Sequence, residues 1–71
     1  MTWEKLKEKA KEMGYIIDEH MITIFHDDMF FRFSKMGTIF VEYAGDSEHH
    51  GLILTRNRTP KQMLQIMEAM E

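Results

Sequence analysis

The chain has 71 residues, of which 44% are hydrophobic and 30% are charged; its formal net charge is −3 and it contains no cysteine. These proportions are those of one small globular domain, and they exclude a disordered chain, a fibre, a disulfide-stapled fold and a thiolate metal centre. No apolar run approaches the ~20 residues that cross a bilayer, and the lack of cysteine favours a reducing compartment, so we expect a soluble cytoplasmic protein.

The charge is unevenly distributed along the chain. Residues 15–55 carry seven acidic and two basic side chains, for a net charge of −5, whereas residues 1–14 and residues 56–71 each carry +1. Proteins that bind nucleic acid without sequence preference usually show a clear basic excess. The acidic middle of the chain argues against such binding over the whole surface and leaves open a local basic patch.

The first predicted element is an amphipathic helix. Thr2 provides an N-cap, and Gly14 provides the left-handed residue that commonly ends a helix. Lysine and glutamate occupy one side of this segment. The apolar side chains of the other side recur at helical spacing, and they are Trp3, Leu6, Ala10 and Met13.

From Tyr15 onward, the periodicity changes to two and the composition turns aromatic and β-branched, which is typical of strands. The predicted strands are residues 15–17, 21–25, 29–33 and 38–43. The turns between them are too short for crossover helices, so we expect antiparallel pairing as a meander. A longer polar loop, residues 44–51, leads to residues 52–55, and the sequence leaves open whether these pair as a fifth strand.

The last segment carries a strong helix-start signal. Thr59 is placed as the N-cap, Pro60 as the first helical residue and Gln62 as the third residue of a capping box. The apolar stripe that follows consists of Met63, Leu64, Met67 and Met70. We therefore predict one α+β domain over residues 1–71, in which an antiparallel meander of four or five strands has an N-terminal and a C-terminal helix packed on one face.

The predicted core combines the two helical stripes with one phase of strand alternation. Truncation of such side chains usually destabilises a small domain strongly. The expected core residues are Trp3, Leu6, Ile22 or Ile24, Phe31, Val41, Leu64 and Met67.

No catalytic motif is found in the sequence. There is no G-x-S-x-G elbow, no P-loop and no G-x-G-x-x-G segment. Ser34 and Ser47 are the only serines, and Ser47 shares one loop with its candidate partners, which cannot be relied on to keep a base at hydrogen-bond distance. We expect no enzymatic activity and no cofactor.

Two segments offer metal-ligand side chains. One is residues 46–50, which contain Asp46, Glu48, His49 and His50, and the other is residues 26–28, which contain His26, Asp27 and Asp28. Adjacent histidines on an extended chain point to opposite sides, and a structural site needs about four supported ligands. We expect no functional metal site, and the sequence leaves open whether the His49/His50 loop binds metal weakly.

The predicted sheet has one face without a helix. Strand alternation places Phe30, Arg32 and Phe40 on this face and exposes them, with Phe25 as a further candidate. An exposed apolar patch usually marks an interaction surface. We therefore expect a non-catalytic protein-interaction module that uses these side chains to bind a protein partner or a second copy of itself.

An alternative function is the binding of single-stranded nucleic acid. Residues 37–43 are similar to the second half of the consensus strand of RNA-recognition motifs, because residues 40–43 match its aromatic–Val–x–aromatic ending. The similarity implies that the aromatic rings and the arginine of the same face stack unpaired bases. The chain departs from the consensus at Met36 and Thr38, and a short turn replaces the helix between the first two strands, so no family is assigned.

A candidate anion contact precedes the last helix. Arg56, Arg58 and Thr59 flank a helix N-terminus, whose free N–H groups and dipole favour a phosphate or a carboxylate. The alternative is that the two arginines pair with the acidic loops of the sheet.

Overall fold

The structure is a computed structural model and describes residues 1–43 and 51–71. Neither helix in these ranges has the length and apolar character that crossing a membrane requires. Within them the chain forms two helices and five strands, which are α1 (Trp3–Glu12), β1 (Ile16–Ile17), β2 (Met21–His26), β3 (Met29–Ser34), β4 (Ile39–Tyr43), β5 (Leu52–Thr55) and α2 (Pro60–Ala69).

The strands form one antiparallel sheet in which each strand pairs with the next one in the chain, in the order β1-β2-β3-β4-β5. The predicted α+β meander is therefore confirmed, and residues 52–55 are its fifth strand. The observed strand ends differ from the predicted ranges by no more than one residue.

Both helices begin at the predicted caps. The Thr2 hydroxyl accepts a hydrogen bond from the Lys5 amide, and Gly14 follows α1 with a φ of +89°. At α2 the capping box is complete, because the Thr59 hydroxyl accepts from the Gln62 amide while the Gln62 side chain accepts from the Thr59 amide. These local bonds satisfy donors that a helix N-terminus otherwise leaves unpaired.

Gly37 connects the β3–β4 turn to the segment that leads into α2. Its φ of +89° lies in the region that favours glycine. A Cβ at this position would lie 2.5 Å from the carbonyl oxygen of Arg58, and the Gly37 carbonyl accepts a hydrogen bond from the Arg58 amide with an N···O distance of 3.0 Å. This close approach brings the start of α2 next to the β3–β4 turn.

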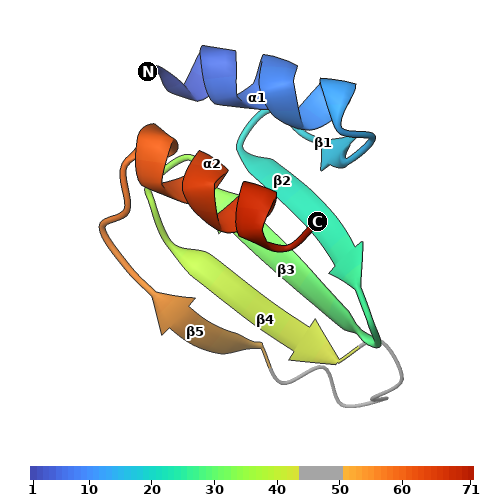
Figure 1. The fold of residues 1–71 in the computed structure, drawn as a ribbon. Helices are drawn as coiled ribbons and strands as arrows, with labels where there is room; N and C mark the ends of the chain where they lie inside the picture. The colour runs from blue at the N-terminus through green and yellow to red at the C-terminus, as the bar shows by residue number, and fades with distance from the viewer. Residues whose placement is uncertain (44–50) are drawn as a thin grey trace.

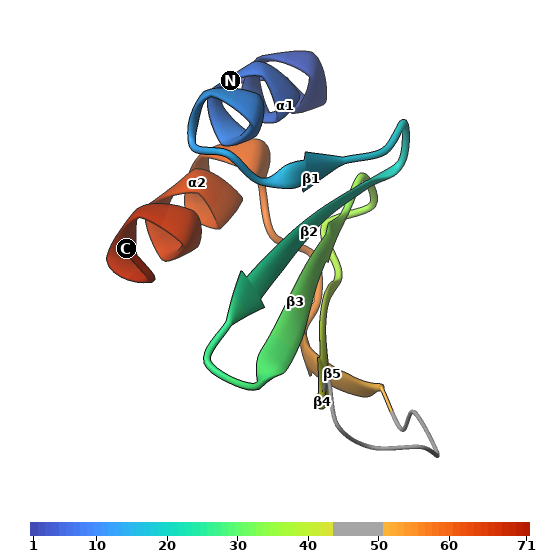
Figure 2. The same ribbon diagram turned by 90° about the vertical axis from the view of Figure 1, so that its right-hand side faces the viewer.

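Both helices lie on one side of the sheet, and the other side is uncovered (Figures 1 and 2). We call the uncovered side the open face. The core fills the space between the helices and the sheet, and the Trp3 indole at its margin donates a hydrogen bond to the Glu19 carbonyl at 3.1 Å. The buried side chains of the described residues are Trp3, Leu6, Ala10, Ile22, Ile24, Phe33, Ile39, Met63 and Met67.

The helices cover only part of the sheet, and this corrects the predicted core. Each ten-residue helix is about 15 Å long, whereas the six-residue strands β2 and β3 extend about 20 Å. Phe31 is therefore only partly buried against the core, and Val41 is partly buried without joining it. Toward that end of the sheet, Tyr43 and Leu52 are exposed over more than half of their area. Leu64 of α2 is also only partly buried, because it lines a hollow between the two helices.

The two edges of the sheet differ in length and in exposure. β1 has two residues and contacts α1. β5 has four residues, and its three apolar side chains, Leu52, Ile53 and Leu54, are all exposed. A register irregularity at Ile39/Phe40 separates two parts of the β4–β5 pairing.

Candidate interaction surface

The strand register brings the three predicted surface residues together on the open face. Arg32 lies directly between Thr23 of β2 and Phe40 of β4, and Phe30 occupies the next open-face position of β3. In the second row, Phe25 and Glu42 flank Phe30. Phe30, Arg32 and Phe40 therefore form the centre of one continuous surface, as strand alternation predicts.

The exposure of these side chains is less uniform than predicted. Phe30 and Phe40 are partly buried rather than fully exposed, because neighbouring side chains on the pleated surface cover their flanks. Phe25 is 58% exposed, and its ring centroid lies 5.0 Å from that of Phe30. Ile53 of β5 continues the apolar surface beside Phe40 and is 46% exposed. The protruding aromatic residue of the open face is thus Phe25.

One ion pair lies in the middle of the open face. A terminal nitrogen of the Arg32 guanidinium is 3.7 Å from a carboxylate oxygen of Glu42. The Arg32 Nε is covered and has no hydrogen-bond partner among the described residues. The positive charge of Arg32 is therefore largely balanced within the chain, although its guanidinium is not fully hydrogen-bonded.

An apolar pocket of about 350 Å³ opens on the same face, at the end of the sheet where the β1–β2 and β3–β4 turns meet. The Lys35 amide donates a hydrogen bond to the His20 carbonyl at 2.9 Å, which joins the two turns. Sequence reasoning missed this pocket because its walls come from segments that are distant along the chain. We call it the apolar pocket, and it is lined by His20, Met21, Ser34, Lys35, Met36, Thr38 and Phe40.

The candidate catalytic and metal-binding residues Ser34, His26 and Asp27 contact residues close to them in sequence. The Ser34 hydroxyl accepts a hydrogen bond from the Thr38 amide at 3.1 Å. The Nε2 atom of His26, the last residue of β2, lies 3.6 Å from a carboxylate oxygen of Asp27 in the β2–β3 turn. Within residues 1–43 and 51–71, no group of three or more His, Asp or Glu side chains is arranged to bind a metal ion. The candidates Asp46, Ser47, Glu48, His49 and His50 lie outside the described residues.

The predicted anion contact is largely engaged in local hydrogen bonds. The Arg58 Nε donates to the Thr55 hydroxyl at 2.9 Å, and the Thr59 hydroxyl caps α2. Arg56 is exposed. Arg58 and Thr59 are thus engaged in hydrogen bonds within the protein, whereas Arg56 is the residue of the three that is exposed without such a bond among the described residues.

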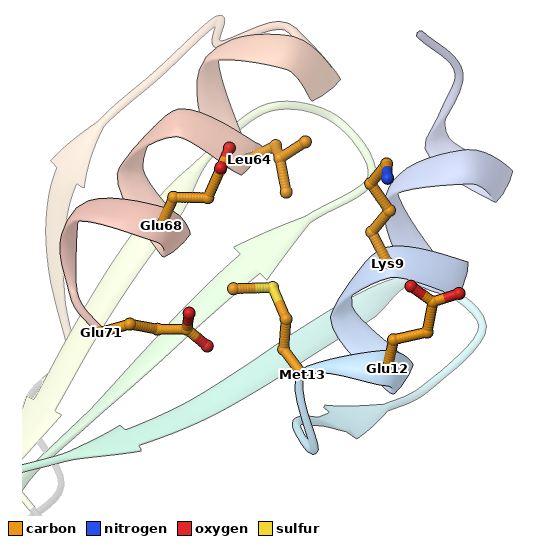
Figure 3. A pocket seen from close by; sticks show the side chains of 6 residues that line it. All are labelled: Lys9, Glu12, Met13, Leu64, Glu68 and Glu71. Carbon is orange, nitrogen blue, oxygen red and sulfur yellow. The ribbon is translucent and has the colours of Figure 1, made fainter.

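A second hollow, of about 230 Å³, lies between the two helices (Figure 3). Lys9 and Glu12 of α1 lie across it from Glu68 and Glu71 at the end of α2. Burial and the adjacent Glu71 carboxylate, which accepts a hydrogen bond from the Tyr15 hydroxyl at 3.4 Å, raise the pKa of Tyr15. This contact connects the end of the chain to the start of the sheet.

The open face combines the protruding Phe25 ring, the Arg32–Glu42 ion pair and the apolar pocket on one surface. No protein-family model, no curated protein and no solved structure matches the chain. Any inference about the function of the chain therefore rests on its own residues.

Proposed function

We propose that this chain is a non-catalytic protein-interaction module that binds its partner through the open face. The observation that carries the proposal is the uncovered side of the sheet, on which Phe25, Phe30, Phe40 and Ile53 surround one internal ion pair. Apolar and aromatic centres with few free charges are typical of protein-binding surfaces. The lack of cysteine fits a role in the cytoplasm.

The charge of the open face favours a protein partner over single-stranded nucleic acid. Binding of a nucleic-acid strand combines stacked aromatic rings with positive charge that tracks the phosphates. Here the arginine of the face is paired with Glu42, and the net charge of the chain is −3. The open face therefore offers stacking surfaces without free positive charge at its centre.

The experiment replaces Phe30 and Phe40 together with serine and compares the variant with Tyr43→Ser. Tyr43 is an exposed aromatic residue of β4 on the helix side of the sheet, which makes it a matched control. Circular dichroism checks that each variant folds. Sedimentation at rising protein concentration measures self-association, and titration with a labelled single-stranded oligonucleotide at several salt concentrations measures nucleic-acid binding.

We expect Phe30→Ser/Phe40→Ser to lose protein association while it stays folded, and Tyr43→Ser to behave as the unchanged chain does. Self-association of the unchanged chain that Phe30→Ser/Phe40→Ser leaves equally strong would contradict the proposal. Oligonucleotide binding that weakens steeply with salt, and that the double variant loses, would instead establish the nucleic-acid alternative.

A further inference from the structure

The open face has a raised end and a hollow end. Phe25 protrudes beside Phe30 at the end near the β2–β3 turn. The apolar pocket lies at the opposite end, next to the β3–β4 turn. Phe25 and the pocket residue Met21 are four residues apart on β2, which separates them by about 13 Å. A raised ring and a hollow at opposite ends of one face fit together when a second copy is turned end to end.

The two ends of β3 carry opposite charges, because Asp28 immediately precedes this strand and Lys35 immediately follows it. Asp27 and Asp28 are exposed in the β2–β3 turn, and Lys35 is exposed in the β3–β4 turn. Asp18 and Glu19 are also at the Lys35 end, but they precede β2 in the β1–β2 turn, closer to the β1 edge. Attraction between two copies therefore requires β3 of one to lie over β3 of the other in the opposite direction, so that Asp28 of each copy faces Lys35 of the other, and this fixes their sideways position.

We infer that the open face binds a second copy of this chain, face to face, about a twofold axis that lies in the interface and runs perpendicular to the strands. The inference rests on the function proposed above and names its partner. Rotation about this axis reverses the strand direction of the second copy and keeps each strand over its counterpart. The Phe25 ring of each copy then enters the apolar pocket of the other, and Asp28 of each copy approaches Lys35 of the other.

The size and the internal charge of the open face suit such an interface. The strands have 2, 6, 6, 5 and 4 residues, so at about 3.4 Å per residue and about 4.8 Å between strands the face covers roughly 375 Å² in projection. Side chains that project from the sheet raise its accessible area toward roughly 600 Å² per partner, which is the lower size limit of specific protein interfaces. Because Arg32 and Glu42 pair within each copy, covering the face buries no unbalanced charge.

Charge exchange between the two turns tests this arrangement. Asp28→Lys and Lys35→Glu each convert both attractive contacts of the dimer into repulsive ones, so each variant alone should dimerise about tenfold more weakly than the unchanged chain. In an equimolar mixture of the two variants, both contacts of the mixed dimer are attractive again. Sedimentation equilibrium of the mixture should therefore recover the dimerisation constant of the unchanged chain.

The matched controls make the same charge changes on a helix. Glu8→Lys and Lys11→Glu, made separately in α1, alter exposed residues of a helix on the covered side of the sheet and should leave dimerisation unchanged. The twofold arrangement is supported if the mixture of Asp28→Lys and Lys35→Glu recovers the dimerisation constant and the control variants do not change it. The reason is that the two charge reversals complement each other when residue 28 of one copy contacts residue 35 of the other.

The possible failures are distinguishable. A mixture that dimerises no more tightly than the two variants alone would overturn the twofold arrangement; if Phe30→Ser/Phe40→Ser still abolishes association, the proposed binding surface stands. An unchanged chain that stays monomeric at millimolar concentration would overturn the second copy as the partner. Association that Phe30→Ser/Phe40→Ser does not weaken would contradict the proposed function itself.

Discussion

The helix-covered face and the open face of the sheet carry similar side chains in different surroundings. Phe33 on the covered face pairs with Ile22 and Ile39 and is completely buried, whereas Phe25 on the open face is 58% exposed. The two phenylalanines lie on adjacent strands, on opposite faces of the sheet and toward opposite ends of it. In a domain this small, aromatic content therefore does not identify the core; the part of one face that the helices cover does.

Removal of a covered-face ring should have the largest effect. Phe33→Ala should lower the free energy of unfolding by about 3–5 kcal/mol, because it leaves a cavity in the core. That loss equals the whole stability that a domain of this size usually has, about 3–5 kcal/mol. Urea denaturation should show Phe33→Ala largely unfolded and Phe31→Ala, whose ring is partly buried, destabilised by a smaller amount. Equal stability of Phe33→Ala and the unchanged chain would contradict the conclusion that the covered face forms the core.

Loss of the α2 cap should have an intermediate effect, since this helix covers the buried face. Thr59→Ala removes the hydroxyl that accepts from the Gln62 amide and should cost about 1 kcal/mol, whereas Thr59→Gly should cost less. Thermal melts of the three proteins under one set of conditions measure this order. Identical melting temperatures would show that the capping box does not contribute to stability.

A single open-face substitution should have a smaller effect on stability. Phe40→Ser removes cross-strand contacts from a partly buried ring, and we expect a cost of roughly 0.2–1 kcal/mol. Urea denaturation at low protein concentration separates this cost from any contribution of association. A loss as large as that of Phe33→Ala would mean that both faces stabilise the fold equally.

The smallest expected effect is the titration of Tyr15, where the end of α2 meets the start of the sheet. Burial first, and then the Glu71 carboxylate, raise its pKa, so the folded state binds the phenol proton more tightly than the unfolded state. This contribution to stability is present below the ordinary pKa of tyrosine and is lost as the pH rises through the raised value.

Glu71→Gln should lower the pKa of Tyr15 without removing the whole shift, because burial remains. Tyrosinate absorbance during alkaline titration measures the change, in a Tyr43→Phe background that leaves Tyr15 as the only tyrosine. An unchanged titration in Glu71→Gln would show that the contact between Tyr15 and Glu71 does not form in solution.

Local signals in the sequence predict most of the fold. Thr2 and Thr59 identify both helix starts, and strand alternation assigns Phe30, Arg32 and Phe40 to one face, because caps and side-chain direction depend on neighbouring residues alone. The ends of the strands follow from short turns between apolar runs.

The features that sequence patterns missed depend on distances between elements. The helices are too short to cover Val41, and no periodicity states where along the sheet a helix will lie. The apolar pocket needs the β1–β2 and β3–β4 turns side by side. The pairing of Arg32 with Glu42 is a diagonal contact between two strands. Strand alternation puts both side chains on the same face but does not predict that they pair with each other.

The free edge of β5 has a practical consequence for concentrated solutions of this protein. Leu52, Ile53 and Leu54 are exposed on an edge strand, and no lysine or proline interrupts them, although natural edges commonly use both to block growth. Unpaired backbone groups along such an edge are a template for a further strand, and addition there is not limited to two copies when the contact does not close on itself. The same short segment that completes the sheet is thus its aggregation-prone site, and a gatekeeper charge such as Leu52→Lys, at the position that pairs with Val41 on the helix side, would protect it without touching the open face.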